Sequence, residues 1–419
     1  MSRGGAGKAI NRRRAEGRAE AGRKMDRLNV LQLVGSFGQG GSERQAVQLA
    51  RLLHESGRFR VRVAVLDPAG PLRAEVEGLR LEDPIAEYPL RSFYDANAAR
   101  QARRFAAHLR ANAISVVQTH DFYSNVFGMA GASLARTPAR VASKRETTGM
   151  RSPAQKLVQR GAFALAHAVV VNAEAVRADL VGGGVPSRKI VTVYNGLDPR
   201  RVEPRSGLTR EDALKSFDLP AGKDLRFVTI VANLRHDVKD HPTFLRAARR
   251  VRERVPGARF VLAGEGELTE PLRALAASLG IADSVFFTGR CARVAELLRA
   301  SDVCVLSSKA EGFSNAILEY MAAARPVVVT DVGGAREAVI EGETGHVVPA
   351  GDDAAMAERI VALLGDAERA RAMGERGRRV VVEKFSCAAQ LRRTVELYER
   401  LLGGARDASS ASALAGEAR

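Results

Sequence analysis

The chain has 419 residues, of which 46% are hydrophobic and 27% are charged. This length and balance exclude a disordered chain and a small disulfide-stapled scaffold, and they predict two domains of about 200 residues each. The 65 Lys and Arg residues exceed the 48 Asp and Glu residues by 17. Residues 1–27 contribute +6, residues 28–205 contribute +10 and residues 206–419 contribute +1. The uneven positive charge indicates that the first half meets an anionic partner.

The cysteine content and the hydropathy of the chain indicate its cellular compartment. Cys291, Cys304 and Cys387 show no metal-ligand spacing, so we expect free thiols, a reducing compartment and no metal site. The longest apolar stretch, residues 161–173, is shorter than the roughly 20 residues of a membrane-spanning helix. The basic start has no apolar core of the kind a secretion signal needs. We therefore expect a cytoplasmic protein.

Short β-branched runs alternate with longer amphipathic stretches, a pattern typical of parallel βαβ units. In the first half, strand-like runs cover residues 29–34, 60–66, 114–118, 139–142 and 168–172, and helical patterns cover 43–54, 96–111 and 153–165. In the second half, strand-like runs cover residues 227–232, 259–263, 285–287, 303–306 and 326–330. The sequence therefore predicts an α/β fold with two doubly wound parallel sheets.

The domain boundary is predicted where Pro199, Pro204 and Gly207 interrupt the pattern. We expect a Rossmann-like N-terminal domain at 28–203, a Rossmann-like C-terminal domain at 204–385, and a helix at 386–403 that packs back toward the N-terminal domain. The basic leader at 1–27 and the Ala/Ser/Gly tail at 404–419 have no periodic apolar face and are expected to be disordered. A ligand is expected in the cleft between the two domains.

The segment 311–319 carries the strongest site pattern, with Glu311 and Glu319 at its two ends. It follows a predicted strand, and a helix starting near Ser314 would point the amides of Ser314, Asn315 and Ala316 at a ligand. Such a helix N-terminus favours an anion such as a diphosphate. The two carboxylates suit hydroxyl groups. Taken alone, they can also be ordinary acidic residues at a helix start.

A second pattern, residues 233–241, follows the strand at 227–232 and carries Arg235 and Lys239. A planar guanidinium and a mobile ammonium group at a strand end can grip a diphosphate and stabilise it as a leaving group. Taken alone, this segment can also be a solvated turn before a helix.

A glycine-rich segment follows the first strand, with Gly40 and Gly41 before Ser42. Ser42 and Gln45 have the spacing of a capping box, and glycines let backbone amides approach a phosphate or sugar. The same segment suggests a dinucleotide fold, but its glycines do not follow the G-x-G-x-x-G spacing. A dehydrogenase would also leave the patterns of the second half without a role.

Taken together, the second half resembles the nucleotide-sugar domain of retaining GT-B glycosyltransferases of family four. The resemblance rests on the E-x7-E pair, the segments 300–308 and 320–330 around it, Gly333-Gly334 and Gly345, all in order. It implies two Rossmann-like domains that face a central cleft. It also implies that Arg235 and Lys239 contact the donor diphosphate, Glu311 the hydroxyls of the transferred sugar, and Glu319 the ribose.

The resemblance extends more loosely to other positions. A family histidine at a matching strand end contacts the transferred sugar, so we count His120 with Arg235, Lys239 and Glu311 as catalytic candidates. The family's nucleotide-binding loops match Gly264-Glu265-Gly266 and Thr288-Gly289-Arg290. The donor-binding candidates are therefore Gly40, Gly41, Gly264, Gly266, Gly289, Arg290, Phe313, Ser314, Asn315, Ala316 and Glu319.

The sequence thus predicts a retaining, metal-independent transfer of a sugar from a UDP- or GDP-type donor to a glycan or lipid-linked acceptor. No cofactor is expected. The basic first half can hold the enzyme at the inner face of the cell membrane, where each basic residue near an anionic leaflet contributes roughly 1 kcal/mol. Two alternatives stay open: a binding protein for RNA or another anionic polymer, and a catalytically silent nucleotide-sugar scaffold.

Overall fold

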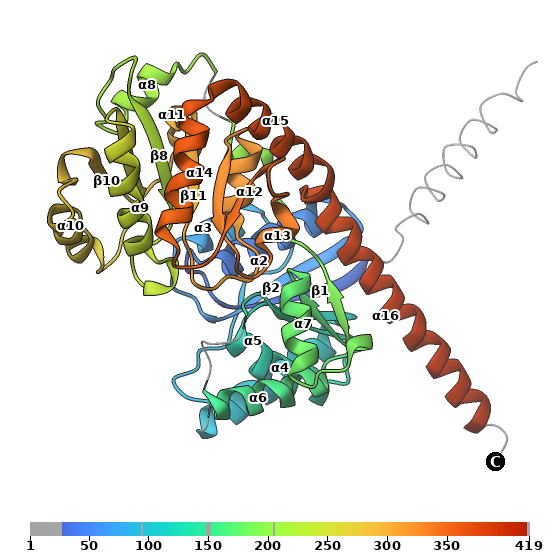
Figure 1. The fold of residues 1–419 in the computed structure, drawn as a ribbon. Helices are drawn as coiled ribbons and strands as arrows, with labels where there is room; N and C mark the ends of the chain where they lie inside the picture. The colour runs from blue at the N-terminus through green and yellow to red at the C-terminus, as the bar shows by residue number, and fades with distance from the viewer. Residues whose placement is uncertain (1–26, 94, 148–151, 204–205, 417–419) are drawn as a thin grey trace, which may run out of the picture.

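Two α/β lobes, each built around a parallel sheet, make up the fold (Figure 1). The computed structural model describes residues 27–93, 95–147, 152–203 and 206–416, with the backbone alone for 405–416. Residues 1–26 and 417–419 lie outside this range, and with them nearly all of the predicted leader. The predicted α/β fold with two Rossmann-like domains is confirmed.

The N-terminal sheet has seven parallel strands within the described residues, in the order β3-β2-β1-β4-β5-β6-β7. Their inner residues are mostly β-branched and buried, as in a sheet covered on both faces. The strands are β1 (Leu28–Ser36), β2 (Phe59–Asp67), β3 (Ala86–Glu87), β4 (Val116–Thr119), β5 (Ala139–Lys144), β6 (Ala168–Val171) and β7 (Ile190–Thr192).

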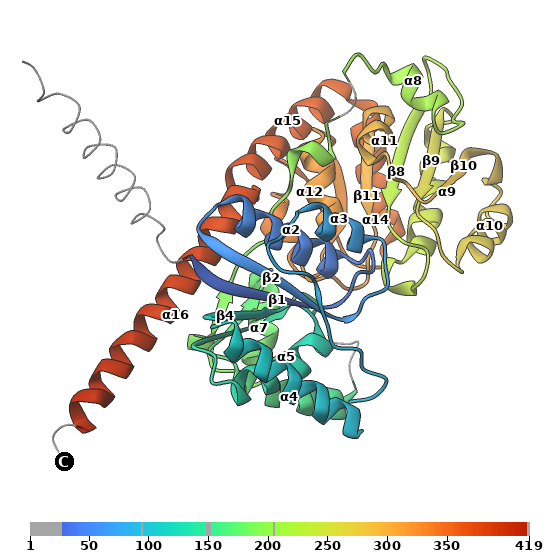
Figure 2. The same cartoon turned by 180° about the vertical axis from the view of Figure 1, so that it is seen from behind.

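Helices cover both faces of this sheet (Figure 2). The helices α2 (Gly41–Glu55) and α3 (Leu72–Gly78) pack on one face. The other face carries α4 (Ala96–Ala111), α5 (Phe122–Leu134), α6 (Pro153–Leu165) and α7 (Glu174–Gly182). The 3₁₀ turn η1 (Ser187–Lys189) leads into β7.

The C-terminal sheet has six parallel strands among the described residues, in the order β10-β9-β8-β11-β12-β13. They are β8 (Arg226–Val231), β9 (Ala258–Ala263), β10 (Val285–Gly289), β11 (Val303–Leu306), β12 (Val327–Thr330) and β13 (Gly345–Val348). The helices are α8 (Arg210–Lys215), α9 (His241–Arg254), α10 (Thr269–Ser278), α11 (Val294–Ala300), α12 (Asn315–Ala322), α13 (Ala335–Ala338), α14 (Asp353–Gly365) and α15 (Ala367–Lys384), with 3₁₀ turns η3 (Asp237–Lys239) and η4 (Ala282–Ser284). The 3₁₀ turn η2 (Pro199–Arg201) lies in the linker before this domain.

Each strand-like run of the sequence corresponds to an observed strand, with ends that differ by a few residues. The strands β3, β7 and β13 were not predicted. They have two, three and four residues and lie at sheet edges, where a short run carries too little pattern to separate it from a loop.

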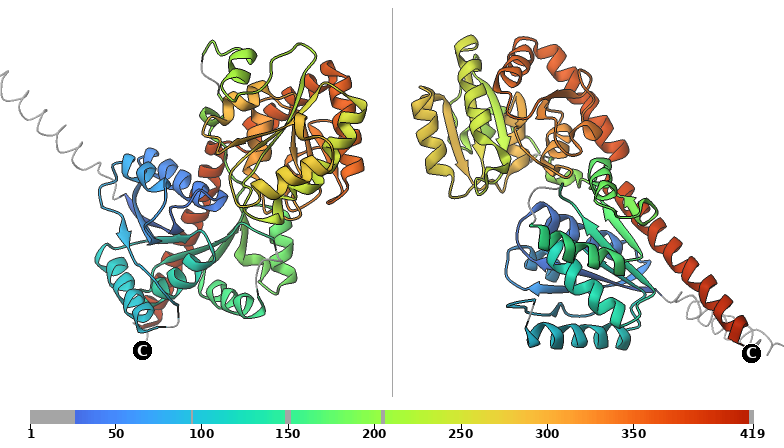
Figure 3. Two further views of the ribbon diagram at one scale, coloured as in Figure 1. Left: turned by 90° about the vertical axis from the view of Figure 1, so that its left-hand side faces the viewer. Right: turned by 60° about the horizontal axis from the view of Figure 1, so that its bottom comes forward.

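Two segments of the chain connect the domains, one near Leu197 and one near Phe385, and they are hydrogen-bonded to each other. The backbone N–H of Leu197 donates to the carbonyl of Phe385 at 2.8 Å, and Leu197 forms an isolated bridge with Ser386. Helix α16 (Cys387–Gly416) then runs back along the N-terminal domain, against α2 and β5 (Figure 3).

The expectation of a disordered tail at 404–419 is wrong as far as Gly416, because α16 continues through these residues. The segment is rich in alanine, which has the highest helix propensity. It also extends a helix that is already formed, so no new nucleation is required.

Tyr398 fixes α16 to the N-terminal sheet. Its side chain is fully buried, and its hydroxyl accepts from Nε2 of Gln32 at 3.1 Å and donates to Oε1 of Gln118. Both glutamines belong to central strands, β1 and β4. The crossing helix is therefore an integral layer of the N-terminal domain.

We expect Tyr398→Phe to lower the free energy of unfolding by about 1–3 kcal/mol, because two buried glutamine side chains lose their shared partner. Urea unfolding followed by circular dichroism measures the loss. Tyr123→Phe, at a half-exposed tyrosine on α5, is the matched control. An unchanged unfolding midpoint for Tyr398→Phe would contradict the role of this hydroxyl.

Candidate functional site

Two cavities open between the carboxyl ends of the sheets, and both domains line each of them. The smaller, of about 380 Å³, contains Lys239, Glu311 and the start of α12 on one side and Arg145 and Thr147 on the other. The larger, of about 620 Å³, contains Glu319 and α2. The carboxyl end of a parallel sheet is where ligands bind in α/β folds.

Lys239 and Glu311 meet at the centre of the smaller cavity. Nζ of Lys239 lies against Oε1 of Glu311 in an ion pair, and Oγ of Ser308 donates to the same oxygen at 2.7 Å. Both charged side chains are more than four-fifths buried. The loops that carry them follow β8 and β11, neighbouring strands of the sheet. The structure thus brings together two residues that are 72 positions apart.

The start of α12 lies beside this pair. Ser314 is its N-cap residue and uses no side chain to cap the helix. Phe313, Ser314, Asn315 and Ala316 all line the smaller cavity. An uncapped helix start of this kind presents free N–H groups and the positive end of the helix dipole to an anion.

Glu319 lies further along α12 in the larger cavity, and its side chain is 11% exposed. Nε of Arg201, from the 3₁₀ turn η2 in the linker, donates to its Oε1 at 3.1 Å. Sequence reasoning missed Arg201, because a charged residue in a linker carries no pattern that would connect it to a helix 118 positions later.

Arg235 lines neither of the two cavities. Its side chain is 60% exposed and its Nη2 is 3.7 Å from Oε1 of Glu265. The loop with Arg235 and the loop with Gly264 and Gly266 lie so close that a side chain at either glycine would clash. A Cβ at Gly264 would be 1.9 Å from the carbonyl oxygen of Ala232, and one at Gly266 would be 2.2 Å from that of Leu234. The loop with Arg235 and the Gly-x-Gly loop therefore form one unit.

The other two predicted positions of the C-terminal domain lie at the end of β10. Gly289 ends this strand with φ of +66°, and Arg290 is exposed. Cys291, which follows them, lines the larger cavity, and burial raises the pKa of its thiol to about 11. The thiol is therefore protonated at neutral pH.

The glycine segment of the N-terminal domain differs in part from the prediction. Gly40 is the N-cap residue of α2 and Gly41 its first residue, so Ser42 lies inside the helix and the predicted capping box is absent from this described segment. Gln45 instead reaches across the cleft, where its Nε2 donates to Oδ1 of Asn315 at 3.3 Å and to the carbonyl of Gly196 at 3.1 Å. Gly41 lines both cavities.

His120 follows β4, but its ring is buried and lines neither cavity between the domains. Nε2 lies 2.7 Å from Oε1 of Gln32, and Nδ1 has no hydrogen-bond partner in the described part of the chain. Burial, and to a lesser extent the charge of Arg145, hold the pKa of His120 well below its usual value, so the imidazole is neutral at pH 7.

Phe313 acts mainly in packing. Its ring is 5% exposed and lies 5.2 Å from Tyr194 and 5.1 Å from Phe385, measured between ring centroids. These three rings join the loop before α12 to the two segments that connect the domains.

Arg145 is the cation of the N-terminal side of the smaller cavity. Nη1 donates to Oδ1 of Asn195 at 2.8 Å, and among the described residues no carboxylate lies within ion-pair distance. Burial lowers the pKa of Arg145 to about 10, so the guanidinium stays charged at neutral pH.

Within the described residues, no group of three or more metal-ligating side chains is found. No helix in that part of the chain is long and apolar enough to cross a membrane.

Family models match both halves of the chain. Residues 39–201 match the model of Glycosyltransferase Family 4, and residues 226–366 match that of Glycosyl transferases group 1. Among curated relatives, the chain is 34% identical over 200 residues to the N-acetyl-alpha-D-glucosaminyl L-malate synthase of Bacillus anthracis, covering 48% of this chain and 51% of the relative. It is 30% identical over 221 residues to the lipopolysaccharide core biosynthesis mannosyltransferase LpsB of Rhizobium meliloti, covering 50% and 60%. The chain thus spans about half the length of these relatives.

Solved structures share the fold over nearly the whole chain. HepE of Anabaena, crystallised in complex with UDP, has a TM-score of 0.78 at 19% identity and covers 89% of this chain and all of its own. Sucrose-phosphate synthase of Thermosynechococcus elongatus has a TM-score of 0.73 at 22% identity, with 90% and 100% covered. These similarities identify the architecture as the GT-B fold.

His241, two residues after Lys239, should make the protein sensitive to acid. Burial and the charge of Lys239 lower the pKa of His241 from 6.5 to about 4. The unfolded chain therefore binds a proton below pH 6.5 that the folded protein does not, and the free energy of unfolding falls as the pH drops. Between pH 7 and pH 5, we expect the free energy of unfolding of His241→Gln to fall by about 2 kcal/mol less than that of the wild type.

Urea unfolding at the two pH values measures this difference. His54→Gln, at the end of α2, is the matched control for the loss of a histidine. An equal loss of stability for the wild type and His241→Gln would contradict the prediction.

Proposed function

Since the chain belongs to the family-four glycosyltransferases, we propose that it is a retaining, metal-independent glycosyltransferase that uses a UDP- or GDP-sugar. The observation that carries this proposal is the Lys239–Glu311 pair beside the uncapped start of α12. Together they offer a cation and backbone N–H groups to a diphosphate, and a carboxylate to the adjacent sugar. A nucleoside diphosphate sugar presents these groups in the same order.

In the proposed complex, the diphosphate lies between Lys239, Arg235 and the start of α12, and the ribose hydroxyls face Glu319 in the larger cavity. Arrival of the diphosphate draws the ammonium group of Lys239 away from Glu311. The carboxylate of Glu311 is then available to accept hydrogen bonds from sugar hydroxyls. Arg201, which already holds one oxygen of Glu319, orients that carboxylate toward the ribose.

Chemically, the bond between the anomeric carbon and the diphosphate oxygen breaks, and a bond from the acceptor oxygen to the same carbon forms on the same face. The acceptor proton passes to the departing diphosphate. The negative charge that develops on the leaving group is stabilised by Lys239, Arg235 and the α12 amides. This electrostatic role needs no metal ion.

The acceptor is proposed to be a glycan or a lipid-linked glycan with an anionic group. Arg145, a charged guanidinium without an ion-pair partner in the described residues, lies opposite Glu311 in the smaller cavity. A half-buried guanidinium that lines a cavity can bind an anionic ligand through charge-assisted hydrogen bonds, although Glu43 already acts on its charge. The name of the relative LpsB, a lipopolysaccharide core mannosyltransferase, supports a role in surface polysaccharide or glycolipid synthesis.

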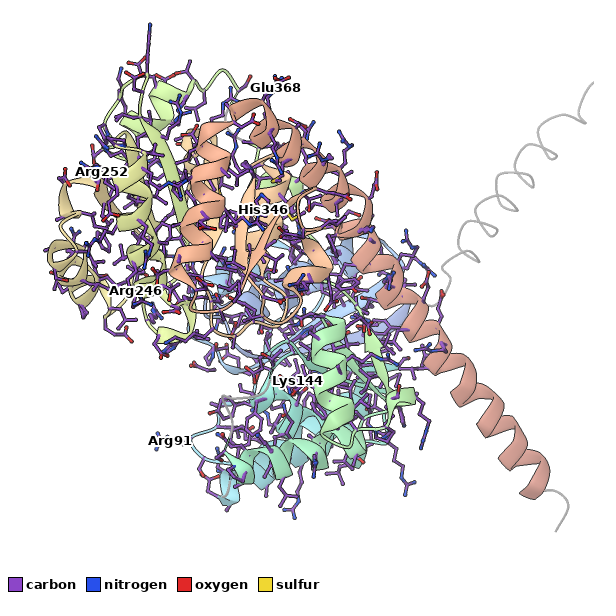
Figure 4. All side chains as sticks on the ribbon, viewed as in Figure 1. Arg91, Lys144, Arg246, Arg252, His346 and Glu368 are labelled. Carbon is purple, nitrogen blue, oxygen red and sulfur yellow. The ribbon has the colours of Figure 1, made fainter. Side chains whose placement is uncertain are left out.

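A surface of the N-terminal lobe also supports a lipid-bound acceptor. Within the described residues, most exposed large hydrophobic side chains lie on α5, α6 and α7: Tyr123, Leu134, Leu157, Leu165 and Val181. A groove of about 600 Å³ runs between α6 and α7, and Lys156 and Arg160 are among its residues. Lys144, labelled in Figure 4, also lines the groove and forms an ion pair with Asp179 at 2.7 Å. Apolar and basic groups together suit an anionic membrane surface.

A panel of UDP-, GDP- and ADP-sugars with EDTA tests the donor and the absence of a metal. We expect protection against thermal unfolding by one nucleotide class and release of its nucleoside diphosphate. Lys239→Met should lower turnover about 100-fold, because the leaving group loses a buried cation. Lys309→Met, at an exposed lysine nearby on the next loop, should retain activity. The proposal fails if no nucleotide sugar binds or if Lys239→Met retains full turnover.

Sedimentation with vesicles tests the membrane surface. We expect binding to vesicles that contain anionic lipid, reversed by salt, and about tenfold weaker binding for the double variant Lys156→Glu/Leu157→Ser. Arg379→Glu, an exposed position on α15, is the control for lost positive charge. Equal binding to neutral and anionic vesicles would exclude this surface while leaving the sugar transfer untouched.

A further inference from the structure

Side chains of the N-terminal domain hold the main chain of the loop that carries Glu311. Oγ1 of Thr147 donates to the carbonyl of Glu311 at 2.9 Å. Nδ2 of Asn195 donates to the carbonyl of Phe313 at 3.0 Å and to Oδ1 of Asn315 at 2.9 Å. Thus the loop 311–315, which belongs to the C-terminal domain, has two of its carbonyl groups, those of Glu311 and Phe313, bonded by the opposite domain.

The backbones of the two domains also touch at this loop. A Cβ at Gly312 would lie 2.0 Å from the carbonyl oxygen of Arg145 and 3.0 Å from Oδ1 of Asn172. On the far side, the N–H of Gly334 donates to the carbonyl of Gly312 at 2.7 Å. The loop is therefore enclosed between a glycine turn of its own domain and the N-terminal domain, and when the domains separate one of these two walls is removed.

Asn195 also connects this loop to Arg145, on the N-terminal side of the cavity. The carboxamide of Asn195 bonds Phe313 and Asn315 through its nitrogen, while its oxygen accepts from Nη1 of Arg145. Nδ2 of Asn172 donates to the carbonyl of Arg145 at 3.3 Å. The guanidinium that faces the acceptor side and the loop that carries Glu311 are thus joined by one side chain.

We propose that Thr147 and Asn195 are positioning residues, which fix loop 311–315 and the direction of the Glu311 carboxylate only when the cleft is closed. The expected effect of these residues on turnover rests on the proposed function, whereas their expected effect on the order of the loop does not. Donor binding belongs to the C-terminal domain, whereas the reactive position of Glu311 requires both domains.

Hydrogen exchange of the full chain without ligand tests the loop directly. Thr147→Val keeps the size of the side chain and removes the hydroxyl, so the peptide that spans 308–319 should exchange about tenfold faster. Thr147→Ser keeps the hydroxyl and should restore slow exchange. Thr192→Val is the matched control, because Oγ1 of Thr192 is buried and has no partner in the described part of the chain.

Kinetics with the nucleotide sugar that turns over in the panel above test the effect on reaction. We expect Thr147→Val to lower kcat about tenfold, with the Kd for UDP or GDP changed less than twofold, because the diphosphate is held by the C-terminal domain. Asn195→Asp provides a second variant of nearly equal shape. Its carboxylate still accepts from Arg145 but cannot donate to Phe313, so kcat should fall in the same way.

The outcomes separate the two proposals. If the wild type turns over no nucleotide sugar, the proposed function fails and the exchange experiment alone decides the role of Thr147. The positioning role is overturned if Thr147→Val exchanges at 308–319 like Thr192→Val. It is also overturned if kcat stays within twofold of the wild type, or if nucleotide affinity falls as much as kcat.

Discussion

The structure depends on how closely the two domains approach at the carboxyl ends of their sheets. Gly312 lies against the carbonyl of Arg145 with no side chain between the two backbones. Around this point the contacts are directional: the carboxylate of Glu337 on α13 accepts from the amides of Glu174 and Ala175, at the start of α7. Such contacts form in one relative orientation of the domains and are exchanged for water when the cleft opens. The site is therefore a property of the closed arrangement.

The two glutamates of the C-terminal side of the cleft are paired with cations before any ligand arrives. Each glutamate of the E-x7-E pattern has a cation, Lys239 for Glu311 and Arg201 for Glu319. Nearly buried carboxylates without partners would cost several kcal/mol each, so these pairs stabilise the ligand-free cleft. In the proposed reaction a diphosphate replaces one carboxylate as the partner of Lys239. The cleft then gains a negatively charged ligand without leaving a buried cation unpaired, and Glu311 becomes available to the sugar.

The sequence predicted what depends on local pattern, and it could not predict what depends on contacts between the domains. Both sheets and the start of α12 follow from β-branched runs and from one helix boundary. The pairing of Arg201 with Glu319 and the contact of Thr147 with Glu311 join residues more than 100 positions apart, and neither motif nor periodicity carries that information. His120 illustrates the same limit: its place at a strand end was predictable, but the buried Gln32 beside it turns the ring into the domain.

The division of charge between the halves fits the separate tasks of the two domains. The second half carries a net charge of +1 and holds its proposed diphosphate with two side-chain cations and helix amides, so it needs no wider positive field. The first half carries nearly all of the surplus and presents Arg145 to the acceptor side. Neither domain alone encloses the loop that carries Glu311, because Thr147 of one domain and Gly334 of the other both bond to its carbonyl groups. In the proposed reaction, a closed cleft would exclude water while both proposed substrates are bound, which would favour transfer to an acceptor over hydrolysis of the donor.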